Sequence, residues 1–324
     1  MARADLLVSL VKASAAGDQE GVRSVTEAII ADERAKNHHV LADRLLRAAS
    51  NGARQTKAAY MGRENSLWRR FATELVPHRH LEDLVLSAGN AQACRDLIEE
   101  QHRASVLRAH SLEPRHRVLL IGPPGNGKTA LAEAIAESLS VSFIVVRYEA
   151  MIGSYLGETA GRLKHIIDYA RTTPSVLFFD EFDAIAKERG DTHETGEIKR
   201  VVTSLLMQVD GLPSYTVTVA ATNHPELLDR AVWRRFQLRL VLPAPSEKEL
   251  AGYLARFERR SGVGWGMASV DLARRLFPVS YAEAEEFCLD VRRRLVLAQG
   301  MARSSPVVSD VLKQWEMRNR AAGI

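Results

Sequence analysis

The sequence RVLLIGPPGNGKTALAEAIAESL, residues 117–139, decides the fold of the central part of the chain. An apolar run is followed directly by a glycine-rich turn and then by a run of helix-forming residues. In the turn, GPPGNGKT at 122–129, glycines let backbone N–H groups face a phosphate, and the start of the next helix favours negative charge. A chance glycine-rich turn lacks this context. The stretch therefore predicts a strand, a phosphate-binding loop and a helix.

Two side chains of this loop add chemistry to its backbone. Lys128 places a cation near the β- and γ-phosphates of a nucleotide, and Thr129 offers a hydroxyl to Mg²⁺. We therefore expect ATP and Mg²⁺ as cofactors, with Lys128 also among the catalytic residues.

A second motif, SVLFFDEFDAIA at 175–186, is an apolar strand that ends in two carboxylates. At the carboxyl edge of a buried strand, Asp180 can hold Mg²⁺ and Glu181 can polarise the attacking water. Asp183 is interpreted as an N-cap or surface residue. The predicted metal ligands are Thr129 and Asp180, and the predicted nucleotide-binding residues are Gly122, Pro123, Pro124, Gly125, Asn126, Gly127, Lys128, Thr129, Ala130 and Asp180.

A third motif, TVTVAATNHPELLDRAVWRRF at 216–236, begins with a strand that ends in Thr222 and Asn223. Asparagine before a turn proline is ordinary turn chemistry when it occurs alone. Because it follows the two preceding motifs in order, we expect the Asn223 amide to orient the attacking water and to sense the γ-phosphate. Glu181 and Asn223 are therefore predicted catalytic residues.

The surrounding pattern predicts an α/β fold of three layers. Near-continuous apolar strands that alternate with helices indicate a parallel sheet covered on both faces. Residues 1–75 are interpreted as helical, with a linker at 51–65, and the chain after Pro245 is helical again at 247–260, 281–298 and 306–318. The expected strands are 118–121, 143–146, 176–179, 217–220 and 238–242, and the expected domains are 1–76, 77–244 and 245–324.

Composition excludes several protein classes. The 324 residues are 46% hydrophobic and 26% charged, a composition that excludes disordered and collagen-like chains. The net charge is only +4, so the sequence gives no indication of a strongly cationic surface for nucleic acid. Two cysteines, Cys94 and Cys288, imply neither a disulfide framework nor a zinc site, and the histidines at 38–39, 78 and 80 lack partners at zinc spacing. No apolar run reaches the length of a membrane span, so the cytoplasm is the expected location.

These motifs resemble the AAA+ ATPases, in particular the AAA family proper and its katanin, spastin and ESCRT-disassembly branch, over about residues 81–300. Tyr155, Leu156 and Gly157 match a pore loop that grips an extended polypeptide. Arg234 and Arg235 match paired arginine fingers that reach the neighbouring subunit's nucleotide, and 210–212 match an intersubunit-signalling segment. Tyr281 stands where relatives have a glycine beside the adenine, and His193 and Glu194 fall where a second pore loop or a solvated connection would lie.

The resemblance implies a ring, usually a hexamer, that hydrolyses ATP to remodel, unfold or thread a protein substrate. It also implies that Arg234 and Arg235 act as catalytic residues across the subunit boundary, although two adjacent arginines also suit a solvated face. Residues 1–76 would recruit a substrate, an adaptor or a separate protease. Two alternatives stay open. One is a motor or regulator associated with nucleic acid, although the sequence shows neither a stripe of basic residues nor a series of aromatic residues that would support it. The other is an assembly scaffold that is switched by nucleotide.

Overall fold

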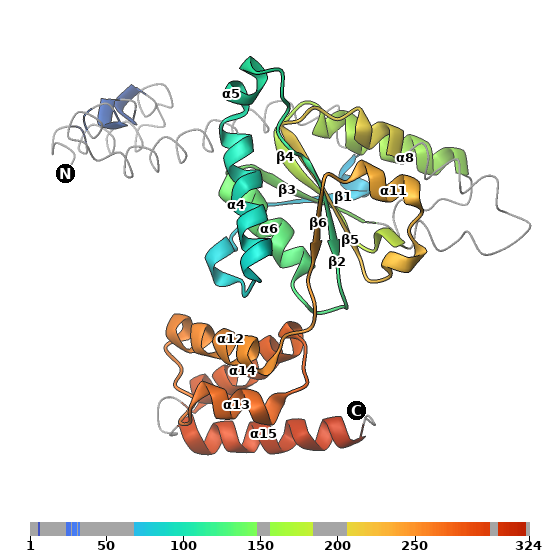
Figure 1. Ribbon diagram of the computed structural model, residues 1–324. Coiled ribbons are helices and arrows are strands. Elements are labelled where there is room, and N and C mark those ends of the chain that lie inside the picture. Colours follow the sequence, from blue (N-terminus) through green and yellow to red (C-terminus); the bar gives the residue numbers. More distant parts are fainter. Residues whose placement is uncertain are drawn as a thin grey trace, which may run out of the picture. The chain divides into compact units, whose positions relative to one another are not determined.

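The computed structural model describes residues 68–147, 156–183, 206–298 and 304–321, and in the N-terminal part only Leu6, 24–26, 28–30 and Asp32 (Figure 1). The chain divides into two compact units, Met1–Ser66 and Leu67–Ile324. The described residues of the first unit are helical, and Ile29 and Ile30 among them are buried. The rest of the predicted N-terminal helices and the predicted linker lie outside the described residues.

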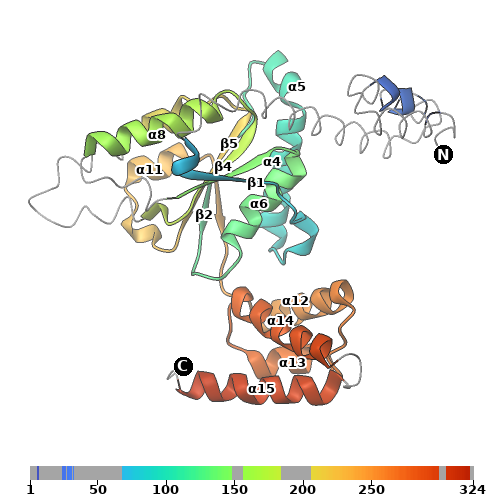
Figure 2. The ribbon, with the colours of Figure 1, turned by 180° about the vertical axis from the view of Figure 1, so that it is seen from behind.

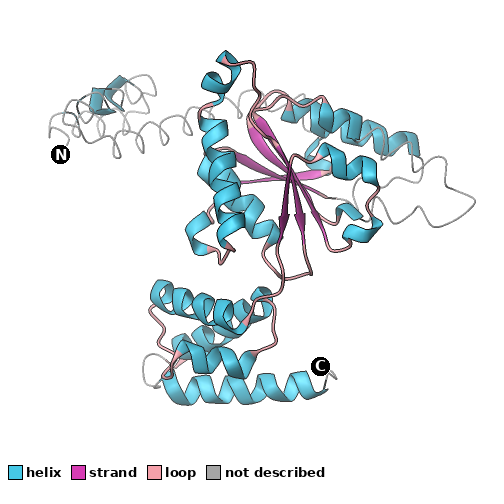
Figure 3. Ribbon diagram, in the orientation of Figure 1, coloured by secondary structure: helices cyan, strands magenta, loops and turns pink. Residues whose placement is uncertain are grey.

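Within the described part of the chain, one six-stranded sheet forms the centre of the second unit (Figure 3). The five strands from β2 to β6 run parallel, as predicted, and their spatial order with the first strand is β1-β3-β4-β5-β2-β6. The strand bounds are β1 Ala72–Leu75, β2 Arg117–Ile121, β3 Ser142–Val146, β4 Ser175–Phe179, β5 Thr216–Thr222 and β6 Leu238–Val241.

Helices cover both faces of this sheet, which makes the three predicted layers. Helices α4 (Ala88–His102) and α6 (Lys128–Leu139) lie on one face, with α5 (Ala104–Ala109) beyond the end of α4, and α8 (Leu156–Ala170) and α11 (Arg230–Arg235) lie on the other (Figure 2). Alternate residues of each central strand enter the two cores, so that all residues of β4 and β5 are buried. Burial on both faces explains why β4 is apolar without alternation, while β5 buries Thr216, Thr218 and Thr222 among its apolar residues.

The first strand corrects the prediction that residues up to about 75 are helical. Ala72 pairs with Val146 and Leu75 with Phe143, so β1 extends the sheet as an antiparallel edge strand. Just before it, the buried Trp68 ring stacks on Tyr169 of α8 with 4.1 Å between the ring centroids. Pairing and aromatic packing with distant residues outweigh the weak local helix preference of this segment.

The C-terminal part is a helical bundle with a core of its own. Its helices are α12 (Glu247–Ser261), α13 (Ser269–Leu276), α14 (Tyr281–Leu297) and α15 (Ser304–Ala321). Ser246 and Ser280 form capping boxes with Glu249 and Glu283, which fix where α12 and α14 begin. Three of these helices were predicted, while α13 was not, because its eight residues are too short for a clear apolar repeat. No described helix is both long and apolar enough to cross a membrane.

Candidate nucleotide site

The predicted phosphate loop lies between β2 and α6 and requires its glycines. Gly125 and Gly127 have φ of 76° and 84°, values that other residues rarely adopt. Residues 124–130 of this loop line a pocket of about 460 Å³. The loop therefore has the open backbone and the helix N-terminus that a phosphate group needs.

Replacing Gly122 with alanine is expected to destabilise the fold more than the same change at Gly127. A Cβ at Gly122 would stand 2.0 Å from the backbone oxygen of Leu242, whereas one at Gly127 would meet nothing within 4 Å. Each alanine carries about 1–3 kcal/mol of backbone strain at positive φ, and the clash at Gly122 adds about 1–3 kcal/mol. Thermal unfolding of the two variants measures the difference. Equal unfolding midpoints would contradict this reading of the loop.

Lys128 is held at the phosphate end of the pocket by three oxygen atoms. Its Nζ donates to the carbonyls of Gly122 at 2.7 Å and Pro123 at 2.9 Å, and to Oδ1 of Asn223 at 2.6 Å. Burial lowers the pKa of Lys128, and the charges of Asp180 and a second nearby carboxylate oppose this effect. The fold thus brings together two predicted catalytic residues that are 95 positions apart.

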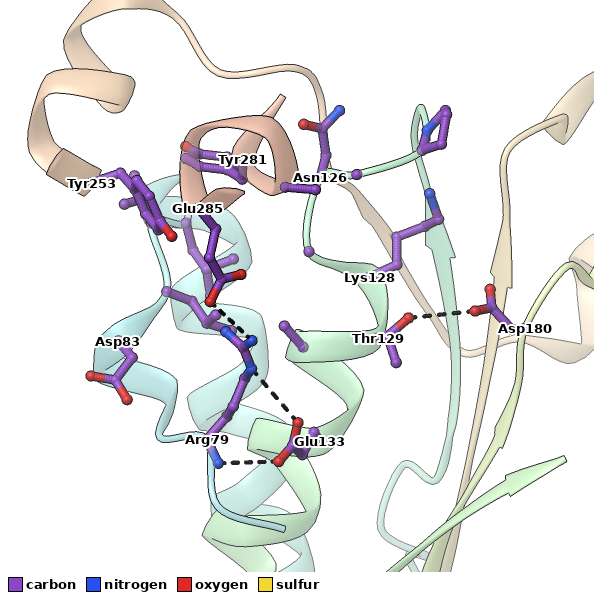
Figure 4. Close-up of a pocket in the computed structure, with 18 of the residues that line it drawn as sticks. Arg79, Asp83, Asn126, Lys128, Thr129, Glu133, Asp180, Tyr253, Tyr281 and Glu285 are labelled. Atoms are coloured by element: carbon purple, nitrogen blue, oxygen red, sulfur yellow. Dashed lines mark hydrogen bonds and ion pairs between the residues drawn. The ribbon is translucent and has the colours of Figure 1, made fainter. Parts of the chain in front are cut away.

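The predicted metal ligands also come together, beside the loop. The Thr129 hydroxyl donates to Oδ2 of Asp180 at 3.4 Å (Figure 4). The other oxygen, Oδ1 of Asp180, accepts the backbone N–H of Glu181 at 2.9 Å. A hydroxyl and a carboxylate are hard oxygen donors of the kind that Mg²⁺ prefers. The residues present therefore fit a magnesium ion bound together with phosphate.

Glu181 occupies a strained turn directly after β4. Its φ is 48°, in the left-handed region that costs a residue with a side chain about 1–2 kcal/mol. Its side chain is exposed and lines the pocket. Strain of this kind is kept where the surrounding structure fixes a functional group, which agrees with a catalytic role for Glu181.

Asp183 departs from its interpretation as an N-cap or surface residue. Its side chain is buried, and Oδ1 accepts the Thr222 hydroxyl at 2.8 Å and the backbone N–H of Asn223 at 3.3 Å. The sequence places Asp183 two positions after Glu181 but contains no sign that it reaches the end of β5.

The opposite end of the pocket includes Tyr281, which the sequence singled out, and four residues that it did not: Arg79, Glu133, Tyr253 and Glu285. Arg79 lies between Glu133 of α6 and Glu285 of α14, with contacts of 3.8 and 3.4 Å (Figure 4). The Tyr281 ring meets Tyr253 edge to face with 5.5 Å between the ring centroids. The Ala282 N–H donates to the Gly125 carbonyl at 2.9 Å, which joins the helical bundle to the phosphate loop. Arg79 and Glu285 are 206 positions apart, so no local pattern could have paired them.

The two predicted arginine fingers lie in different surroundings. Arg235 contacts Asp210 within its own chain, with 3.1 Å between Nε and Oδ2, and the other oxygen of Asp210 accepts from Arg117 at 2.6 Å. Arg234 is exposed and forms no ion pair with any carboxylate of the described residues. In this conformation Arg234 is the more exposed of the two arginines.

The predicted pore loop is only partly described. Tyr155 lies outside the described residues, as do His193 and Glu194. Leu156 and Gly157 are the first two residues of α8.

Comparisons with known proteins agree with this site. Residues 118–244 match the ATPase family associated with various cellular activities (AAA). The chain is 35% identical over 302 residues to an uncharacterized AAA family ATPase, y4kL, of Sinorhizobium fredii, which covers 92% of this chain and 90% of that protein. It is 31% identical to the cell division cycle protein 48 homolog of Archaeoglobus fulgidus and 31% identical to the proteasome-activating nucleotidase of Methanocaldococcus jannaschii.

The extent of these matches differs. The match to the cell division cycle protein 48 homolog spans 70% of this chain and 32% of that protein, and the match to the proteasome-activating nucleotidase spans 70% of this chain and 55% of that protein. The match to y4kL, by contrast, spans nearly the whole of both chains. The phosphate loop, the carboxylates after β4 and the likeness over almost the full length together show that the chain belongs to the AAA family of ATPases.

Proposed function

We propose that this protein is a motor that hydrolyses ATP, with Mg²⁺, to remodel protein substrates. One observation carries the proposal: Lys128, Thr129, Asp180, Glu181 and Asn223, which come from three separate motifs, all line a single pocket. Residues of α12 and α14 line the other side of the pocket. This is the arrangement expected of a nucleotide site between a P-loop and a helical lid.

Each of these residues has a proposed role. The loop from Gly122 to Ala130 binds the phosphates through its backbone, and Lys128 compensates their charge. Thr129 and Asp180 would hold Mg²⁺, which neutralises charge on the β- and γ-phosphates when it is bound. Glu181 accepts a proton from the attacking water, and Asn223 orients that water.

The assembly and the substrate are proposed from the family likeness. We infer a ring, a hexamer by analogy, in which Arg234 and Arg235 complete the neighbour's site, with pore and finger motifs similar to those of the katanin and spastin branch. The relatives named cell division cycle protein 48 and proteasome-activating nucleotidase support action on proteins. We further propose that residues 1–76 recruit a substrate, an adaptor or a separate protease, that 77–244 hydrolyse ATP and that 245–324 form the lid.

Replacing Tyr155 with alanine is expected to remove the stimulation of ATP hydrolysis by a chemically unfolded protein while hydrolysis without substrate continues. An aromatic ring gives a threaded chain a large contact area without requiring a particular side chain. Phosphate release with and without the unfolded protein measures the effect, and Tyr215→Ala, a change at an exposed tyrosine elsewhere, is the control. Full stimulation in the Tyr155 variant would contradict threading through this loop, and stimulation by DNA instead would favour the nucleic-acid alternative.

A further inference from the structure

Asp183 is a buried carboxylate near the proposed active site that does not line the nucleotide pocket. Only 7% of its surface is exposed. A buried carboxylate is costly unless it is hydrogen-bonded, and the partners of this one are at the end of β5. Its place in the fold therefore indicates a role that it carries out through its neighbours.

The partners of Asp183 are the residues that lead into the turn after β5. Oδ1 accepts from the Thr222 hydroxyl at 2.8 Å and from the Asn223 N–H at 3.3 Å. The Thr222 oxygen in turn accepts the N–H of His224 at 3.0 Å. One carboxylate oxygen and one hydroxyl thus fix the backbone on both sides of Asn223. The Asn223 side chain, held in this way, contacts Lys128 at 2.6 Å.

Asp183 is also joined through the backbone to the strained turn that carries Glu181. The turn is anchored on one side by the bond from the Glu181 N–H to Asp180. On the other side, the buried Phe182 packs edge to face against Phe179 and Phe236, with 6.3 and 5.9 Å between ring centroids. Asp183 follows immediately, so its hydrogen bonds tie this turn to the neighbouring strand end.

We propose that Asp183 is a positioning residue that couples the turn bearing Glu181 to the strand end bearing Asn223. This coupling fixes the positions of both side chains relative to the γ-phosphate and the attacking water. The proposal rests on the roles proposed above for Glu181 and Asn223. Because Asp183 itself does not reach the pocket, its loss should affect the hydrolytic step and not the binding of ATP. A misplacement of about 1 Å in a catalytic group can cost about 10²-fold in rate.

Steady-state hydrolysis by the full chain tests this coupling. Asp183→Ala is expected to lower kcat by about 10²-fold with little change in KM. Asp183→Asn keeps an oxygen that can accept from Thr222 and should lose less. Thr222→Val should also lower kcat, whereas Thr222→Ser keeps the hydroxyl and should restore most of it. The matched control is Thr218→Val, because Thr218 is buried on the same strand and its hydroxyl has no hydrogen-bond partner among the described residues.

A double variant distinguishes positioning from a general loss of structure. If Asp183 acts through Asn223, Asp183→Ala should add little to the loss of kcat already caused by Asn223→Ala. Independent, multiplying losses would overturn the proposal, and so would a raised KM with unchanged kcat. If Asp183→Ala does not fold, as judged by circular dichroism, the Thr222→Val and Thr222→Ser pair decides, and an unchanged kcat in Thr222→Val would overturn the coupling.

Glu181→Gln, measured in the same series, separates this inference from the proposed function. Full turnover in Glu181→Gln would refute the catalytic role on which the coupling depends. Slow turnover in Glu181→Gln, together with wild-type kcat in Asp183→Ala and Thr222→Val, would refute the coupling alone.

Discussion

Replacing Glu181 with glutamine is expected to slow ATP hydrolysis by about 10²–10⁴-fold while ATP still binds. The glutamine amide has nearly the same shape as the carboxylate but cannot accept a proton from water. Glu181 lines the pocket without contributing to the phosphate loop, so the loop and Lys128 remain to hold the nucleotide. Phosphate release measures turnover, and a fluorescent ATP analogue measures binding.

A matched control for this prediction is Glu99→Gln. Glu99 is an exposed carboxylate of α4 that pairs with Arg103 and does not line the pocket, so its replacement makes the same chemical change away from the site. We expect wild-type turnover in this control. If Glu181→Gln hydrolyses ATP as fast as the wild type, Glu181 is not the base, and another pocket residue must carry that role.

Replacing Arg234 with alanine is expected to reduce hydrolysis by about 10³–10⁵-fold under conditions where the wild type is assembled. An arginine supplied by a neighbouring subunit stabilises charge that develops on the transferred phosphoryl group. Arg234 is exposed, while Arg235 is bound to Asp210 of its own chain, so we expect the larger loss at Arg234. Hydrolysis per subunit, measured against protein concentration, should rise for the wild type and stay low for the variant.

Mixing experiments extend this prediction to the shared site. Adding Arg234→Ala subunits to wild-type protein should lower hydrolysis per wild-type subunit, because some wild-type pockets would then face a neighbour without the guanidinium group. Arg230→Ala changes another exposed arginine of α11 and serves as the control. Activity independent of concentration, together with no effect of mixing, would show that each chain completes its own site.

The central strands and the phosphate loop could be predicted because their signals are local. The run at 117–139 contains the strand, the glycines and the helix start within 23 consecutive residues. The inner strand β4 carries the continuous apolar pattern that burial on two faces imposes, whereas the edge strand β6 alternates buried and exposed residues. Both strands could be located from their apolar residues. Order along the chain then placed Asp180, Glu181 and Asn223 at one edge of the sheet, where parallel strands end together.

The interpretation of residues 68–75 shows where a local signal fails. This segment was interpreted as helical, yet it forms a short helical turn followed by β1, because Trp68 packs on Tyr169 and β1 pairs with β3. Short segments have weak intrinsic preferences that pairing with an existing sheet edge overrides. Nothing within the segment itself marks either partner.

The sequence was enough to predict the nucleotide chemistry, since the residues expected to bind phosphate and metal sit at fixed offsets from strands and helices. The folded molecule was needed to show that Arg79 bridges Glu133 and Glu285, that Asp183 is buried against Thr222, and that Arg235 is paired while Arg234 is exposed. These contacts join residues between 25 and 206 positions apart, counted from Asp210 to Arg235 and from Arg79 to Glu285. Their geometry depends on how distant elements pack together, whereas helix and strand periodicity depends only on near neighbours.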